Sequence, residues 1–183
     1  YSSLLKGAFG SQNALADTIV RATPLLLVGL GICIAFRGGV INIGGEGQLI
    51  AGAIPATLLG PSFPDAPAIV IVPAALLLGF LGGAVWGGIP GVLKAYYNVN
   101  EILSTIMLNI IAVQAMNFLL RGPMIDPVQL QAASAIPQTA RLSDVFDLPR
   151  WVPTRLHAGA LLAVILAFVV YIFLWRTTTG YRI

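Results

Sequence analysis

A glycine-rich run at 38–48 holds the first polar side chains whose chemistry could serve a function. Five of its eleven residues are glycine, and glycine costs about 1 kcal/mol per helical position relative to alanine. We therefore expect a broken helix, with Asn42, Glu46 and Gln48 offering a carboxylate and two amides along a solute pathway, as discontinuous helices do in transporters. The alternative interpretation is a turn between two spans that leaves Glu46 in water.

A second set of polar residues repeats along the segment 102–120 and just before it. Glu101, Thr105, Asn109 and Asn117 fall at multiples of four, and side chains at i and i+4 share a helix face. Amides inside a membrane are costly unless they find partners or water. Two interpretations stay open: hydrogen bonds to neighbouring helices, or a polar route. Glu101 and Asn109 are the candidate functional positions of this row.

No catalytic, metal-binding or nucleotide-binding group can be assembled from the remaining residues. The chain has one histidine, His157, and one cysteine, Cys33, which is too few for a Ser/His/Asp constellation or a cysteine-cluster metal site. It has no G-x-x-x-x-G-K-[ST] run to cradle phosphates. We therefore expect no enzyme activity, no cofactor and no metal on this chain. If ATP is used, another chain binds it.

The composition indicates a membrane protein. Of the 183 residues, 57% are hydrophobic and 9% are charged, against roughly 25% charged in ordinary soluble domains. This excludes a soluble enzyme, a disordered chain and a nucleic-acid binder. Because lipid offers no partner for a free N–H or C=O, spanning segments of this kind must be helical. The predicted fold class is all-α, a polytopic transmembrane helix bundle.

Apolar stretches poor in charge predict about five membrane spans of roughly 20 residues each. They lie at about 19–36, 42–60, 67–93, 102–120 and 156–175. The proline-rich segment 121–155 indicates a structured extramembrane loop with one short helix, or else a linker. The distribution of lysine and arginine does not decide the orientation.

One predicted span carries a ridge of glycines. Gly79, Gly83, Gly87 and Gly91 are four residues apart and form overlapping G-x-x-x-G units, which let another backbone approach closely. We expect this ridge to pack against a neighbouring helix. The alternative is that glycines are simply common in membrane helices.

Four motifs, taken in order, resemble one protein family. They are ATPLLL at 22–27, AFRGGVINIGGEGQ at 35–48, NVNEILSTIMLN at 98–109 and RTTTGYRI at 176–183. The chain is similar to the membrane-spanning permease subunit of bacterial ABC importers of the simple-sugar and nucleoside type. The resemblance implies a partial transmembrane permease domain over 1–183, corresponding to the N-terminal half without its first helix. It also implies that 176–183 is cytoplasmic, that 121–155 is extracytoplasmic, and that the coupling region begins just beyond Ile183.

The resemblance further implies a location in the bacterial inner membrane and several partners. These are two ATPase subunits, a second permease subunit and an extracytoplasmic solute-binding protein. Gly180, Tyr181 and Arg182 would lie at the edge of the ATPase contact. The nucleoside branch of the family is the nearer match and the ribose-type branch the more distant. From the residues alone, an ATP-independent carrier or channel and a non-transporting scaffold stay open, and the substrate is not specified.

Overall fold

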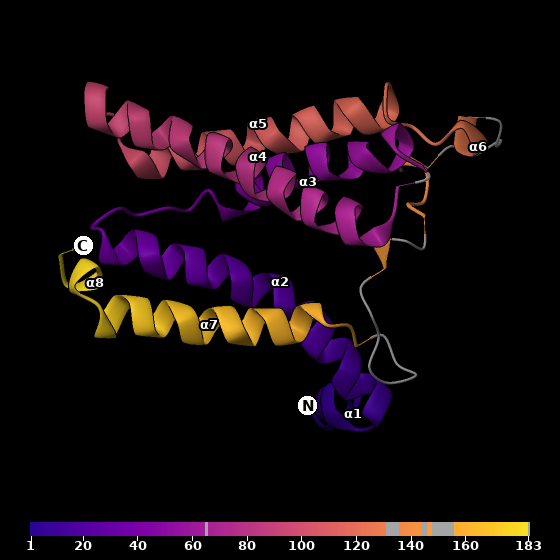
Figure 1. Ribbon diagram of the computed structural model, residues 1–183, viewed down its shortest axis with the longest axis horizontal. Coiled ribbons are helices and arrows are strands. Elements are labelled where there is room, and N and C mark those ends of the chain that lie inside the picture. Colours follow the sequence, from indigo (N-terminus) through magenta and orange to yellow (C-terminus); the bar gives the residue numbers. More distant parts are fainter. Residues whose placement is uncertain (65, 131–135, 144–145, 148–155, 183) are drawn as a thin grey trace. The chain divides into compact units, whose positions relative to one another are not determined.

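The computed structural model describes residues 1–64, 66–130, 136–143, 146–147 and 156–182 (Figure 1). These residues form a series of helices, which confirms the predicted all-α class. The helices are α1 (Ser2–Phe9), α2 (Gln12–Arg37), α3 (Gly45–Ser62), α4 (Ala68–Tyr97), α5 (Glu101–Arg121), α6 (Pro127–Leu130), α7 (Gly159–Arg176) and α8 (Thr178–Arg182).

The chain divides into two compact units. Unit 1 comprises 1–41 and 148–183, and unit 2 comprises 42–147. In unit 1, α2 packs against α7, while α1 and α8 attach to α2 and α7 respectively. In unit 2, α3 packs against both α4 and α5, and α4 also touches α5. The candidate polar residues of the glycine-rich run and of α5 therefore belong to the same unit.

Four of the described helices are long and apolar enough to cross a membrane: α2, α4, α5 and α7. They overlap four of the five predicted spans, although α2 begins seven residues before the predicted start at 19 and α4 ends four residues after the predicted end at 93. The fifth prediction, 42–60, falls on α3, which is not among them and begins three residues later than expected. Glu46, Gln48 and several glycines and prolines lower its apolar character. At 18 residues and 1.5 Å per residue, α3 is about 27 Å long, so a membrane crossing by α3 stays a prediction.

Small residues bring α3 and α4 together. A Cβ atom on Gly52 would overlap the carbonyl oxygen of Gly79, and one on Gly82 would lie 2.6 Å from the carbonyl oxygen of Ala51. A Cβ on Gly83 would lie 3.2 Å from the carbonyl oxygen of Gln48. These distances leave no room for side chains, so the two backbones touch directly, as at other small-residue helix contacts in membranes.

The predicted glycine ridge matches this contact in part. Gly79, Gly83 and Gly87 face α3, whereas a Cβ on Gly91 would meet no described atom within 4 Å. Gly82, which was not predicted, completes the contact. The ridge therefore ends one helical turn earlier than the spacing indicates.

In unit 1, an aromatic pair near the end of α7 contacts the last residue of α2. The Tyr171 and Trp175 rings stack with centroids 5.7 Å apart. The Arg37 guanidinium, at the last residue of α2, lies 5.8 Å from the Trp175 ring centroid, within the range of a cation–π interaction. This contact joins the C-terminal ends of α2 and α7.

Among its described residues, the predicted loop 121–155 contains the short helix α6 (Pro127–Leu130), in line with the expectation. The backbone N–H of Asp126 donates to the carbonyl oxygen of Gln138 at 2.9 Å, and Leu142 lies against Gly60 at the end of α3. This part of the loop therefore belongs to unit 2 and packs on the end of α3. The rest of the predicted loop, at 131–135, 144–145 and 148–155, lies outside the described residues.

Candidate functional site

The predicted helix break lies between α2 and α3. The backbone is not helical from Gly38 to Gly44, which is shorter than the predicted 38–48 because α3 already begins at Gly45. Gly39 adopts φ +72°, a left-handed conformation that glycine enters without the steric cost of a Cβ. The glycines thus allow the chain to leave one helix and start another within a few residues.

Asn42 and Gln48 pair across the start of α3. The Asn42 amide nitrogen donates to the Gln48 Oε1 at 3.3 Å, and the Gln48 amide nitrogen donates to the Asn42 Oδ1 at 3.2 Å. The same Asn42 oxygen accepts the Gly44 backbone N–H at 2.8 Å, forming an Asx turn. Both predicted amides therefore shape the break, and a Cβ on Gly87 of α4 would lie 2.9 Å from the Gln48 amide nitrogen.

Asn109 links α5 to both sides of this helix start. Its Oδ1 accepts the backbone N–H of Gly47 at 2.8 Å, and its Nδ2 donates to the carbonyl oxygen of Ile43 at 2.9 Å. The first four N–H groups of a helix lack intrahelical partners, and Asn109 satisfies one of them for α3. Of the two interpretations of the polar row, Asn109 follows the first: it hydrogen-bonds to a neighbouring element.

The first turn of α5 is fixed separately. Asn100 caps the helix by accepting the backbone N–H groups of Ile102 and Leu103. Glu101 forms an ion pair of 2.9 Å with Lys94, in the last turn of α4. Between them, Asn98 adopts a left-handed φ of 52° and ends α4. Glu101 therefore ties the α4–α5 turn and is not brought together with the break.

Glu46 and Trp86 flank the helix start without hydrogen bonds among the described residues. Glu46, predicted as part of the pathway, is exposed in the first turn of α3. A negative charge at this position interacts favourably with the positive end of the helix dipole. The Trp86 indole N–H on α4 is buried without a partner, and lies 3.1 Å from where a Gly47 Cβ would stand. Sequence reasoning missed Trp86. Because Trp86 follows Gly83 by three residues, it lies on the same helix face as the glycine ridge, and this spacing could have indicated its place beside α3.

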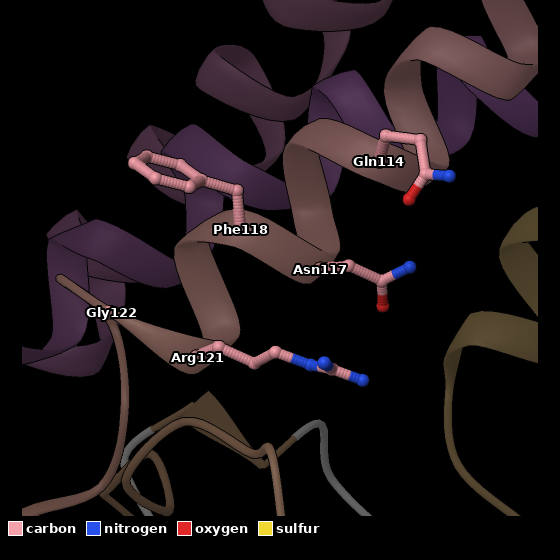
Figure 2. A pocket seen from close by; sticks show the side chains of 5 residues that line it. All are labelled: Gln114, Asn117, Phe118, Arg121 and Gly122. Carbon is pink, nitrogen blue, oxygen red and sulfur yellow. The ribbon is translucent and has the colours of Figure 1, made fainter.

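A second polar group lies at the other end of α5. A hollow of about 400 Å³ is lined by Gln114, Asn117, Phe118, Arg121 and Gly122. Figure 2 shows the side chains of Gln114, Asn117 and Arg121 extending to one side of α5, whereas Phe118 points to the other. Sequence reasoning placed Asn117 in the polar row of α5. The spacing 114, 117 and 121, which puts all three on one helix face, was the missed signal.

The residues predicted near an ATPase contact form α8 in unit 1. Gly180 is buried, and a Cβ there would overlap the carbonyl oxygen of Phe173 and the backbone of Leu174. Its N–H donates to the Thr177 hydroxyl at 3.1 Å. Tyr181 and Arg182 are exposed. Gly180 thus lets α8 fold back against α7 and present its next two side chains outward.

Metal-ligand chemistry finds no support in the described part of the chain. Among those residues, no group of three or more His, Cys, Asp or Glu side chains lies close enough to hold a metal ion.

Comparison with known proteins gives the family. Residues 14–183 match the family model described as branched-chain amino acid transport system / permease component. The chain is 36% identical to the guanosine ABC transporter permease protein NupP of Bacillus subtilis over 183 residues, which cover 100% of this chain and 52% of that protein. No solved structure matches.

Two further relatives carry related names. The glucose ABC transporter permease protein TsgB13 of Haloferax volcanii is 34% identical, with 100% of this chain and 50% of that protein covered. The nucleoside ABC transporter permease protein NupB of Lactococcus lactis is 31% identical, with 100% and 51% covered. The chain thus spans about half the length of these relatives. Together with its four apolar helices, the match over nearly its whole length establishes that this multi-pass membrane chain belongs to the family of permease components of branched-chain amino acid transport systems.

Proposed function

We propose that this chain is part of the membrane-spanning permease subunit of an ABC importer, and that it helps to form the translocation pathway for nucleosides or simple sugars. The observation that carries the proposal is the helix break at 38–44, held by Asn42, Gln48 and Asn109. Irregular backbone at membrane depth is tolerated where protein buries it or where it lines a cavity. Family membership and the names of the relatives support the same function.

The proposed partners follow from this assignment. Two ATPase subunits would bind and hydrolyse ATP, a second permease subunit would complete the pathway, and an extracytoplasmic solute-binding protein would deliver the solute. The exposed Tyr181 and Arg182 of α8 would lie at the edge of the ATPase contact. With α8 on the cytoplasmic side, the 121–155 loop would face the outside of the membrane. The membrane itself would be the bacterial inner membrane.

Reconstitution of the full-length protein in liposomes tests the proposal. With the ATPase subunits inside and the binding protein outside, we expect guanosine or glucose uptake that requires ATP hydrolysis and stops with a non-hydrolysable analogue. Uptake that proceeds without ATPase subunits and follows an ion gradient would instead identify a secondary carrier or channel. A third result, in which no solute is transported and none alters stability, would identify a scaffold.

Glu46 provides a test of the helix break itself. In the same liposomes, we expect Glu46→Ala to lower ATP-dependent uptake about tenfold, which corresponds to about 1.4 kcal/mol, because the exposed carboxylate at the start of α3 is then lost. Glu46→Gln keeps the shape and a hydrogen-bonding group and separates the role of charge from that of size. Unchanged uptake and unchanged coupling to ATP hydrolysis in Glu46→Ala would remove Glu46 from the functional residues.

A further inference from the structure

The C-terminal half of α5 carries a polar face that makes no hydrogen bond with the described residues of unit 2. Gln114, Asn117 and Arg121 share one face at spacings of three and four. At about 100° per residue, this face lies nearly opposite Ser104, Thr105 and Ala112, which are buried in the unit. The packing of α5 on α3 and α4 therefore leaves these three polar side chains free for another role.

Lipid is an unsuitable neighbour for this face. Gln114 lies seven residues before Arg121 at the helix end, which is about 10 Å along the axis. Within the described residues, the side chains of Gln114, Asn117 and Arg121 make no hydrogen bond. Because amides inside a span are costly when they lack polar partners, something polar must meet them in the working protein.

The same three side chains line the hollow at the end of α5 (Figure 2). Its volume of about 400 Å³ falls within the range of about 300–1,000 Å³ that is usual for small-molecule sites. Gly122 leaves one wall without a side chain, and Phe118 flanks the opposite side of the helix. A small solute can therefore reach the polar groups.

We infer that Gln114, Asn117 and Arg121 form a contact site for a neutral nucleoside at the outer mouth of the pathway; this inference rests on the proposed function. Two carboxamides supply donors and acceptors together, a pairing that matches the edges of purine bases, and a guanidinium matches the O6 and N7 acceptors of guanine. None of the five lining residues is acidic, so the site does not favour a cation. Arg121 also suits the negative end of the α5 dipole, so the decisive tests rest on the two amides.

Cysteine accessibility tests the site directly. In the full-length protein with its native cysteines replaced by serine, and assembled with its partners, we expect Asn117→Cys to react with a membrane-impermeant maleimide applied from outside. Guanosine should slow this reaction about tenfold when its concentration is ten times the dissociation constant, and glucose should not. Val85→Cys, on an apolar face of α4, should not react.

Transport gives the second measurement. Asn117→Leu and Gln114→Leu should each lower ATP-dependent guanosine uptake about tenfold, the factor that corresponds to a lost hydrogen bond of about 1.4 kcal/mol. Ile110→Leu, four residues before Gln114 and also exposed, should leave uptake unchanged at equal abundance in the membrane.

The outcomes separate the site from the function. If Asn117→Cys does not react in the assembled protein, another helix covers the face and the inference is wrong. It is equally wrong if guanosine leaves the labelling rate unchanged, or if both leucine variants transport normally. In each of these cases the wild-type protein would still show ATP-dependent uptake, so the proposed function would stand. If the wild type transports neither guanosine nor glucose with ATP, the function and the site fall together.

Discussion

Replacing Gly52 with alanine is expected to destabilise the pairing of α3 and α4 by about 1–3 kcal/mol or more, as overpacking of a tight contact does. The added Cβ would overlap the carbonyl oxygen of Gly79, and would stand 3.5 Å from the backbone nitrogen of Gly83. Both are backbone atoms, so no side chain can rotate away and the helices must separate. Thermal unfolding of the full-length protein in detergent measures the effect, as a lower melting temperature.

Gly88 provides the matched control on α4. A Cβ at Gly88 would meet no described atom within 4 Å, and alanine is favoured over glycine in a helix by about 1 kcal/mol. Gly88→Ala should therefore leave the melting temperature unchanged or raise it. Equal behaviour of Gly52→Ala and Gly88→Ala would show that the close approach of the two backbones does not stabilise the protein.

Most helix ends could be predicted from the sequence because they are marked by local chemistry. The predicted spans 19–36 and 102–120 end one residue before α2 and α5 do, at Arg37 and Arg121, where a cation suits the negative end of the helix dipole. The glycines at 38–39 and 44–45 predicted the break. Such signals need only neighbouring residues, and the structure confirms them.

The start of α3 needed a distant partner. The prediction began this segment at 42, whereas the helix begins at Gly45. Asn42 turns the chain by accepting the Gly44 N–H, and Asn109 binds Ile43 and Gly47 from α5. Asn109 lies far outside the run 38–48, so no pattern within that run could reveal its contacts with Ile43 and Gly47. Contacts between residues so far apart in sequence are the part of the site that the sequence alone could not supply.

The glycine ridge illustrates a second limit. A spacing of four predicts a continuous ridge from Gly79 to Gly91, but the use of a ridge depends on the length of its partner. Gly52 of α3 meets Gly79, and Gln48 meets Gly83 and Gly87. Because α3 begins at Gly45, the position one turn before Gln48 already lies outside the helix, and a Cβ on Gly91 meets no described atom within 4 Å. Gly82 joins the contact because α-helices repeat every 3.6 residues and not every four.

Replacing Asn109 with leucine should lower ATP-dependent transport, whereas the change Ile110→Leu at the next residue of α5 should not. The substitution leaves the buried Gly47 N–H without its acceptor, at a cost of about 1–3 kcal/mol, and it also frees the carbonyl oxygen of Ile43. The helix break would then lose both of its hydrogen bonds to Asn109 of α5. We expect a loss of ATP-dependent uptake of about tenfold or more, the factor for about 1.4 kcal/mol, and faster amide hydrogen exchange at Gly47.

Asn109→Asp separates the two hydrogen bonds of Asn109. A carboxylate can still accept the Gly47 N–H, and a negative charge at a helix N-terminus is favourable by about 0.3–1 kcal/mol. It cannot donate to the Ile43 carbonyl oxygen and repels it instead. Slow exchange at Gly47 should therefore persist in the aspartate variant, while uptake falls as it does in Asn109→Leu. Ile110→Leu, the next residue, should match the wild type in both measurements.

If Asn109→Leu and the wild type transport equally, the attachment of the break to α5 has no part in moving the solute. If Asn109→Asp retains full uptake, the hydrogen bond to Gly47 alone is sufficient, and the one to Ile43 has no role in transport.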